Sequence, residues 1–535
     1  MSKRLCVLGV FVLSTVLAVP AMADGGFCPP LWRDGVLGPL DFNPAFSSIA
    51  TYDVAGDTRD DLVFSSFFNS IKDPTGVTTI GFFADDLVAR IPGIGDLDAA
   101  SFDPATDVER LTDLGGGPPQ TVWPNSVTRV PTGVLPFQAV VVPGGFHTTP
   151  FPGRLTVIDV DDPARTEYIV DQTTRIIGAP CAFPRDPNNA PYFYHQARWF
   201  DMDGDGLDDL VTVRASFKVA GGVCAPPLGE VVWFENPGVA IDPAVEWTEH
   251  LLVAFPSDPF GAEIHLDLHD FEGDGVPEII GTHFFTGELI TIYGAPVGQT
   301  WADVDVFTNP ARSKDIVTDQ GRPFEIEIVD LNNDGHAEVL ATNHQGDGCF
   351  AVTDDAIPGR VFVAQPPSGD IFASDWTIHV IKDNIRPNPT FPEPTMGPGR
   401  LAPGRANAFY PVRWMEGRRK PWIVVGGDEA SKVWVLRPRS QHPDNWEYRS
   451  AVVFDINDIY GANTTQSLTA PAPSQGNSIS TVGGVGLRYD RKGPFGRTEL
   501  YIPVFEGRDF HKLTFRWQRG GDRVRCVVDE PVACP

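Results

Sequence analysis

One acidic ten-residue pattern occurs four times in this chain, and it constrains the possible folds more than any other feature. In its clearest form, oxygen-bearing side chains stand at positions 1, 3, 5 and 9, glycine at position 6 and an aliphatic residue at position 10. The four copies begin at Asp53, Asp201, Asp270 and Asp330. Such internal repeats indicate one structural unit copied along the chain rather than several unrelated domains.

The residues around each acidic segment predict four antiparallel β-strands per unit. An alternating stretch precedes the segment and an aliphatic stretch follows it, as at residues 210–213. Two further strand-like stretches come next, for example residues 229–234 and 247–252. Residues 376–381 and 446–451 resemble the last of these stretches. Each unit is therefore expected to contain a strand, an acidic loop, a second strand, a turn and two outer strands.

Three weaker copies extend the repeat over the rest of the chain. Residues 130–140, 414–423 and 490–500 match the spacing but have lost most of their acids, and the seven copies are about 73 residues apart on average. We interpret the acidic stretch 155–162 as a turn, because it falls where the outer strands of the second unit belong. The prediction is an all-β fold, a single seven-bladed β-propeller of four-stranded antiparallel blades. Six or eight blades, or two smaller propellers, stay open as alternatives because the second and seventh copies are weak matches.

The N-terminal segment, residues 1–23, has the layout of a secretory signal peptide. Lys3 and Arg4 precede an apolar run over residues 5–19, and small residues lead up to Ala23. The apolar run is shorter than the roughly 20 residues that span a bilayer. We therefore predict cleavage after Ala23, a mature propeller over residues 24–535, and a secreted, periplasmic or cell-surface location.

Six of the seven cysteines remain after that cleavage. An even number of cysteines in an exported chain favours disulfide bonds. The six are Cys28, Cys181, Cys224, Cys349, Cys526 and Cys534. We expect Cys28 to pair with Cys526 or Cys534 and so to join the first blade to the last. Cys181 and Cys224 flank the inner strands of the third unit and could also pair.

The charge of the chain limits its partners. It has 70 acidic and 41 basic residues, a formal net charge of −29. This excess disfavours binding to nucleic acids and to anionic membrane surfaces, and it favours cations or neutral molecules. No later stretch is long and apolar enough to span a membrane, and we expect a monomer.

The four clear loops resemble the FG-GAP or VCBS repeats of integrin-alpha-like and many other secreted propellers. The resemblance is strong over these loops and extends to the whole chain through the repeat spacing. It implies a β-propeller with calcium in the blade loops, about four structural ions in all. It does not imply one activity, because the family includes adhesion modules, lectin-like proteins and a few sugar lyases and dehydratases.

The spacing of the acids suits calcium chemically. Ca²⁺ takes six to eight oxygen ligands at about 2.3–2.6 Å, and acids at alternate loop positions can all turn toward one ion. Glycine at position 6 lets the chain reverse after the third ligand. The first copy departs from the pattern at Ala55 and Thr58. The candidate ligands are Asp53, Asp57, Asp61, Asp201, Asp203, Asp205, Asp209, Asp270, Glu272, Asp274, Glu278, Asp330, Asn332, Asp334 and Glu338.

Polar residues on two predicted innermost strands form a second candidate site. Strand alternation places four polar side chains of residues 263–269, and two of residues 324–329, on one face each. The candidate catalytic residues are His265, Asp267, Glu325 and Glu327. They could hold a divalent metal or supply an acid and a base to a sugar. The alternative is that they form hydrogen bonds between blades or line a wet channel without chemistry.

Two functions are compatible with these features. The leading one is recognition of an extracellular glycan or protein by a rigid propeller with loops on its faces. The alternative is a carbohydrate-active enzyme, a polysaccharide lyase or sugar dehydratase, that uses the axial cluster. The sequence contains neither a GxSxG nor an HExxH motif, so it points to no hydrolase or zinc-protease class.

Overall fold

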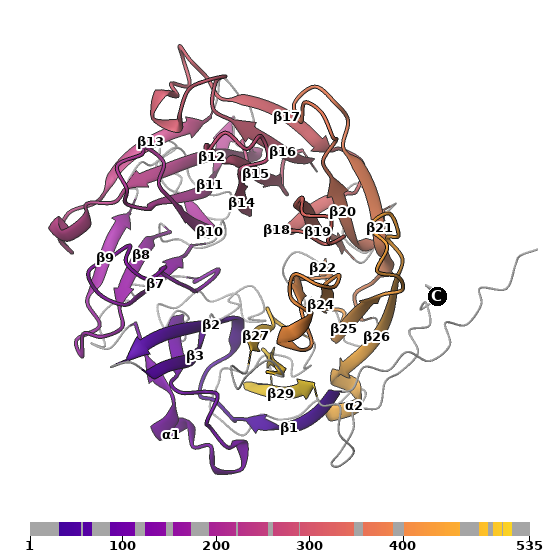
Figure 1. The fold of residues 1–535 in the computed structure, drawn as a ribbon. Coiled ribbons are helices and arrows are strands. Elements are labelled where there is room, and N and C mark those ends of the chain that lie inside the picture. The colour runs from indigo at the N-terminus through magenta and orange to yellow at the C-terminus, as the bar shows by residue number, and fades with distance from the viewer. Residues whose placement is uncertain are drawn as a thin grey trace, which may run out of the picture.

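The innermost strands of seven β-sheets surround a common axis, and the sheets radiate from it as blades (Figure 1). The computed structural model describes residues 31–54, 57–66, 86–112, 123–145, 153–172, 192–220, 223–254, 261–287, 289–346, 357–388, 401–460, 481–489, 496–505 and 507–515. All seven sheets contain four antiparallel strands, which follow chain order in six of them, while the seventh combines the last three strands with the first; the fifth also carries one short extra strand. The prediction of an all-β, seven-bladed propeller is confirmed.

The blades follow one another along the chain. From innermost to outermost strand they are β2 (Pro44–Val54), β3 (Asp57–Ser66), β4 (Leu87–Ile91) and β5 (Glu109–Arg110); β6 (Thr128–Arg129), β7 (Ala139–Pro143), β8 (Leu155–Asp159) and β9 (Glu167–Asp171); β10 (Phe193–Phe200), β11 (Asp209–Ala220), β12 (Val223–Glu235) and β13 (Thr248–Val253); β14 (Leu266–His269), β15 (Glu278–His283), β16 (Leu289–Gly294) and β17 (Arg312–Val317); β18 (Arg322–Val329), β19 (Glu338–Gly346), β20 (Gly359–Gln365) and β21 (Thr377–Ile385), with β22 (Leu401–Ala402) paired to β19; β23 (Ala406–Phe409), β24 (Trp422–Gly426), β25 (Lys432–Pro438) and β26 (Tyr448–Asp455); and β27 (Gly486–Tyr489), β28 (Thr498–Val504), β29 (Asp509–Phe515) and β1 (Leu31–Leu37).

Helices are short and lie in the connections. The α-helices are α1 (Pro104–Asp107) and α2 (Ile456–Tyr460), and the 3₁₀ helices are η3 (Ala99–Ser101), η4 (Gly238–Ala240), η5 (Trp301–Asp303) and η6 (Arg413–Met415). Within the described ranges, no helix has the length and apolar character needed to cross a membrane.

The repeat unit predicted from the sequence is confirmed, including its three weaker copies. All seven copies coincide with the connection between the innermost and second strands of a blade. The stretch 155–162 is only partly the turn that the sequence suggested: residues 155–159 form the third strand of the blade, β8, and residues 160–162 begin the connection to β9. The agreement arises because each acidic or formerly acidic segment is followed by the second strand of its blade, which is buried on both faces. Trp422–Gly426, for example, is buried throughout.

The first strand of the chain closes the ring. β1 pairs with β29 and becomes the outermost strand of the seventh blade, with Leu31 opposite Phe515 and Leu37 opposite Phe510. The ring is therefore closed by backbone hydrogen bonds between the two ends of the described chain. The predicted bridge from Cys28 to Cys526 or Cys534 lies outside the described residues, as do Cys181 and Cys349 and the signal peptide.

The hydrophobic core lies between blades. In one cluster, Val211 and Trp233 of the third blade pack with Leu266 and Ile279 of the fourth, and all four are at most 1% exposed. Each blade thus buries its two faces against its two neighbours, and this apolar packing stabilises the ring.

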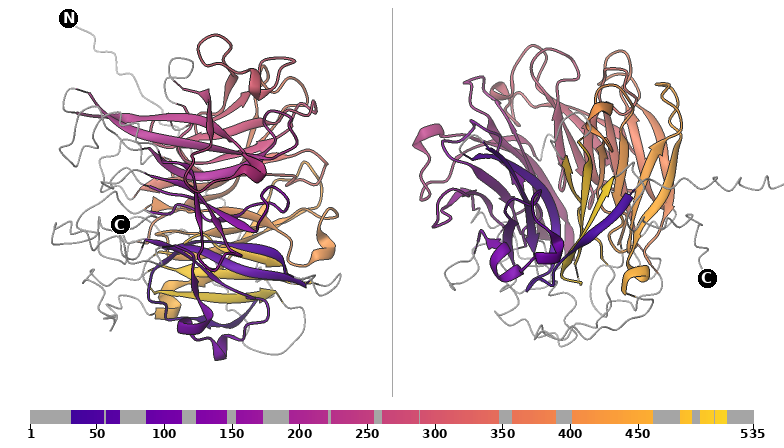
Figure 2. Two further views of the ribbon diagram at one scale, coloured as in Figure 1. Left: turned by 90° about the vertical axis from the view of Figure 1, so that its left-hand side faces the viewer. Right: turned by 60° about the horizontal axis from the view of Figure 1, so that its bottom comes forward.

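The ring has two distinct faces, which Figure 2 shows from two further sides. Connections from the first to the second strand, and from the third to the fourth, lie on the face that we call the acidic-loop face. The turns from the second to the third strand, and the passages from blade to blade, lie on the opposite face. The innermost strands run from the opposite face to the acidic-loop face, so the two candidate regions can be placed along the axis.

Candidate functional site

The acidic loop of the third blade brings three of its predicted ligands together. Oxygen atoms of Asp201, Asp203 and Asp209 all lie within 4.8 Å of one another. The chain reverses at Gly204 and Gly206, which both have positive φ angles, a backbone conformation that L-residues rarely adopt. Convergent carboxylate oxygens in a reversing loop are the donor set that calcium prefers.

Three loops share one hydrogen-bond framework. In each loop, the side chain at position 1 accepts a hydrogen bond from the backbone N–H of position 6. The side chain at position 5 accepts one from the backbone N–H of position 7, and the side chain at position 9 accepts one from the backbone N–H of position 2. The pairs are Gly206 to Asp201, Leu207 to Asp205 and Met202 to Asp209; Gly275 to Asp270, Val276 to Asp274 and Phe271 to Glu278; Gly335 to Asp330, His336 to Asp334 and Leu331 to Glu338. The acids at positions 1, 5 and 9 therefore stabilise the fold of the loop through these hydrogen bonds.

The acidic residue at position 9 is buried in each of these loops, at most 2% exposed. Burial raises the pKa of Asp209 to about 6, and the charges of Asp203 and Asp205 contribute to the rise. Burial likewise raises the pKa of Glu278 to about 7 and that of Glu338 to about 8. Burial thus disfavours the charged form of these carboxylates relative to water, and a nearby cation would offset this effect.

The third-position side chain differs between the loops. In the fourth blade, Arg312 forms a salt bridge with Glu272, with 2.6 Å between Nη2 and Oε2. In the fifth, Asn332 Nδ2 donates to Asp334 and Glu338, at 2.8 Å each. Among the described residues, the close grouping of three carboxylates occurs only in the Asp201 loop.

The first blade has a tight hairpin where the sequence pattern predicts an ion loop. β2 and β3 pair without a register shift from Ser47 and Phe64 up to Val54 and Asp57. Asp61 is fully buried and bonded to Arg90 and to the backbone N–H of Gly93, at 3.3 and 2.9 Å. The side chains of Asp53 and Asp57 lie outside the described residues. Two arginines, Arg90 and Arg59, thus balance the position-9 charge in this blade.

Polar side chains of the innermost strands connect neighbouring blades. Each accepts a hydrogen bond from a backbone N–H of the next blade: Gln196 from Leu266 at 3.1 Å, Asp267 from Ile328 at 2.9 Å, and Glu327 from Ala408 at 2.7 Å. Asp267 also pairs with Arg198, 2.9 Å between Oδ1 and Nε. Two of the four predicted catalytic residues therefore hold blades together.

The other two predicted catalytic residues are in contact. His265 Nδ1 lies 3.2 Å from Glu325 Oε2 and 3.0 Å from Gln196 Oε1. Burial lowers the pKa of His265 well below its usual value, and the nearby charge of Arg405 lowers it further. Glu325 also pairs with Arg405, 3.0 Å from Nε, and the Arg405 guanidinium lies 4.4 Å from the centre of the Phe46 ring. Arg405 of the sixth blade thus reaches both the fifth and the first.

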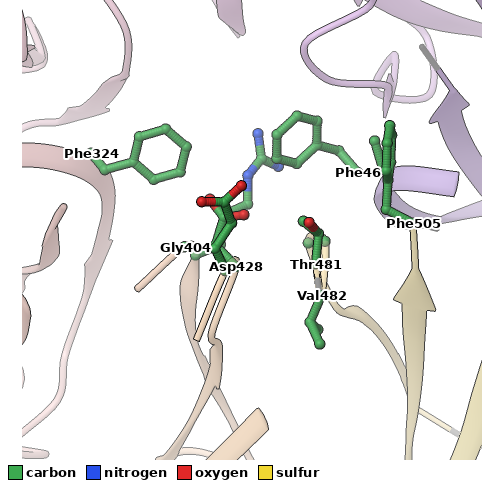
Figure 3. Close-up of a pocket in the computed structure, with 12 residues that line it drawn as sticks. Phe46, Phe324, Gly404, Asp428, Thr481, Val482 and Phe505 are labelled. Carbon is green, nitrogen blue, oxygen red and sulfur yellow. The ribbon is translucent and has the colours of Figure 1, made fainter. Parts of the chain in front are cut away.

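A pocket lies at the end of this cluster, on the face opposite the acidic loops (Figure 3). It has a volume of about 160 Å³. The lining residues come from the beginnings of innermost strands and from turns between second and third strands: Ala45, Phe46, Phe324, Gly404, Arg405, Asp428, Glu429, Thr481, Val482, Gly483, Gly484 and Phe505. In Figure 3 the rings of Phe324 and Phe46 lie on either side of the Asp428 carboxylate.

No sequence motif marks this pocket. Asp428 and Glu429 stand in a turn without a motif, and Thr481 precedes a weak repeat copy. Tryptophan rings often stack on sugars, but Trp123, Trp301 and Trp422 are buried, and the exposed Trp414 lies on the acidic-loop face rather than at this pocket.

The fold and these sites define a seven-bladed β-propeller with acidic loops on one face and an aromatic, charged pocket at the other end of its axis. No protein-family model matches the chain, and no curated protein matches it. Among solved structures, the chain is similar to an auxiliary nutrient binding protein from Bacteroides thetaiotaomicron VPI-5482, with 9% identity, a TM-score of 0.38, and coverage of 91% of this chain and 98% of that one.

Two rhamnogalacturonan lyases are also similar to this chain. YesW matches with 11% identity and a TM-score of 0.36 over 90% of this chain and 74% of its own. The exotype lyase YesX matches with 11% identity and a TM-score of 0.36 over 91% of this chain and 75% of its own.

Proposed function

We propose that this protein is an exported, calcium-stabilised propeller of the FG-GAP/VCBS type that binds an extracellular glycan or protein. The observation that carries the proposal is the pocket at the end of the axis, where three phenylalanine rings, an arginine and two carboxylates converge. Pockets with apolar walls and a few convergent polar groups are the usual sites for ligands in proteins.

Calcium fits the donor set of the loops. Asp201, Asp203 and Asp209 would hold the best-formed site, and the acids of the loops at Asp270 and Asp330 would hold further ions. In the latter two, Glu272 and Asn332 would exchange their protein partners for the ion. A bound ion supplies positive charge that keeps the position-9 carboxylate ionised, and so it ties the first strand of a blade to the second.

The export proposal rests on the N-terminal segment up to Ala23, and the negative charge of the chain accords with a cation-rich exterior. Cleavage after Ala23 and disulfide pairing among the six remaining cysteines form part of it.

The enzyme alternative is supported by one specific contact. His265 Nδ1 lies 3.2 Å from Glu325 Oε2. Arg405 pairs with Glu325 and also lines the pocket. A lyase or dehydratase would need His265 or Glu325 to exchange a proton with a sugar. The contacts of Asp267 and Glu327 with the neighbouring blades favour a structural role for those two residues.

The binding proposal can be tested with the mature chain on glycan and extracellular-protein arrays. Phe46→Ala and Phe324→Ala each remove an aromatic wall of the pocket, and each should reduce binding about tenfold, because stacking on a ring contributes roughly 1 kcal/mol beyond burial. Trp414→Ala is the matched control, since it removes an exposed ring on the other face. Unchanged binding in both pocket variants would contradict the proposal, and turnover of a bound glycan would favour the enzyme.

A further inference from the structure

The connection between the third and fourth strands of the fourth blade, residues 295–311, exposes two apolar side chains on the acidic-loop face. Phe307 is 75% exposed, and no other phenylalanine or tryptophan among the described residues is exposed to that extent. Val297 is 82% exposed. Apolar side chains that are exposed singly are common, whereas a group of them with polar residues around it marks an interaction surface. We call residues 295–311 the Phe307 loop.

Hydrogen bonds within the Phe307 loop fix the positions of both apolar side chains. The carboxylate of Asp305 accepts a bond from the backbone N–H of Phe307 at 2.8 Å. Asn309 Nδ2 donates to Gln299 Oε1 at 2.6 Å, and this bond joins the stretch that carries Phe307 to the stretch that carries Val297. A surface that is already ordered loses little conformational entropy on binding, so more of the free energy of apolar burial contributes to affinity.

The Phe307 loop is anchored between the acidic loops of the third and fourth blades. Its Trp301 is buried and belongs to the same apolar cluster as Met202 of the third-blade loop. Trp301 Nε1 also donates to the carbonyl oxygen of Pro277, in the fourth-blade loop, at 2.8 Å. The loop that carries the two exposed apolar side chains therefore has an acidic loop on either side.

The charges around the Phe307 loop are acidic. Both aspartates of the loop are exposed, and it contains no lysine or arginine. The adjoining segments 201–209 and 270–278 carry five and four acids and likewise no lysine or arginine. Arg312 follows the loop directly, but its Nη2 already pairs with Glu272 Oε2 at 2.6 Å. One calcium ion in each segment would offset two charges, so both segments would stay negative.

These charges favour one kind of partner. A second copy of this chain would place its own acidic surface against these carboxylates, because the formal net charge is −29. Anionic lipid headgroups meet the same repulsion. A basic protein segment has complementary charge, and the aliphatic stems of its lysines and arginines can also cover apolar side chains such as Phe307.

We propose that the Phe307 loop and the two acidic segments beside it form a docking surface for a basic segment of a protein partner, whose apolar side chains cover Phe307 and Val297. The surface lies on the face opposite the pocket. The proposal is therefore independent of ligand binding at the pocket, and either can fail without the other.

The test is isothermal titration calorimetry of the mature chain, in saturating calcium, with short synthetic peptides. A peptide of alternating lysine and leucine should bind at least about tenfold more tightly than its lysine–serine counterpart, and its affinity should fall as salt is added. Phe307→Ser should weaken its binding about tenfold and Val297→Ser several-fold, because each removes apolar area that the peptide covers. Val380→Ser is the matched control, since Val380 is 45% exposed on β21, outside this surface. All three variants should keep the wild-type melting temperature, because the substituted side chains are exposed.

The other outcomes overturn the proposal. Equal affinity of the lysine–leucine peptide for the wild type and the two loop variants places its binding elsewhere, and no binding at all removes the basic partner. Equal or tighter binding of a glutamate–leucine peptide contradicts the charge complementarity. Dimerisation that Phe307→Ser abolishes assigns the surface to a second copy, and binding to zwitterionic lipid vesicles that the same variant abolishes assigns it to a membrane.

Discussion

The carboxylate of Asp267 accepts a hydrogen bond from the backbone N–H of Ile328, which belongs to the next blade. Its other oxygen pairs with Arg198 of the preceding blade. One side chain thus connects three consecutive blades at the axis. Gln196 and Glu327 accept equivalent backbone bonds at two neighbouring interfaces, so the device repeats along this side of the ring.

Removing this connection should lower the free energy of unfolding of the ring without changing its affinity for a ligand. Asp267→Ala leaves the Arg198 guanidinium and the Ile328 N–H without their partner, and we expect a loss of about 2–3 kcal/mol in the free energy of unfolding. Asp267→Asn, which keeps an oxygen acceptor, should lose less. Urea denaturation with titration of the ligand checks both expectations. Loss of binding in a variant that remains fully stable would instead assign Asp267 to the ligand site.

Ring closure depends on the core side chains of β1. Leu31 is fully buried against Phe515 and Trp422. Leu31→Ala should therefore cost about 2–5 kcal/mol, as large-to-small changes in a core do. Val36→Ala on the same strand is the control, because Val36 is 43% exposed. Equal losses in the two variants, measured by chemical denaturation, would show that the ring does not depend on this contact.

The repeat spacing in the sequence predicts the fold, whereas no sequence pattern predicts the pocket. Seven copies of one spacing determine the number of blades, and residues as different as Asp270 and Trp414 occupy equivalent connections. The pocket depends on side chains such as Phe46, Phe324 and Asp428, which are far apart in the chain and meet only after the ring closes. No local pattern encodes that meeting.

The candidate metal and axial residues were predictable in type but not in contacts. Alternation indicated that Asp267 and Glu327 face the axis, but which backbone N–H each accepts depends on the stagger between blades. The first acidic copy shows the same limit. Its departures at Ala55 and Thr58 were visible, but the tight β2–β3 hairpin and the arginine partners of Asp61 arise from the tertiary structure.

Calcium removal should lower the stability of the protein. We expect a chelator to lower the melting temperature, because an ion that binds only the folded state adds RT ln(1 + [L]/Kd) to its stability. Asp201→Asn should remove part of that shift, since Asp201 is one of the three convergent carboxylates. Asp208→Asn is the control within the same loop, because Asp208 lies outside that group. A melting temperature that is the same with chelator and with micromolar calcium would refute the structural role of the metal.

Glu263 should make the free energy of unfolding fall as the pH rises, which is opposite to the effect of a carboxylate whose pKa is lowered in the folded state. Burial raises its pKa to about 8, while bonds from Thr286 and from the Phe285 N–H oppose the rise. Because the folded-state pKa lies above the usual value of 4.5, the folded protein holds a proton that the unfolded chain has lost. The contribution of Glu263 is therefore present below about pH 4.5 and is lost as the pH rises to about 8, by at most about 1.4 kcal/mol per pH unit.

Glu263→Gln mimics the protonated form and should flatten this slope relative to the wild type, whereas the exposed control Glu246→Gln should not. The measurement is the difference in unfolding free energy between variant and wild type at fixed calcium across that pH range, and a difference that stays constant with pH would show that Glu263 is ionised throughout.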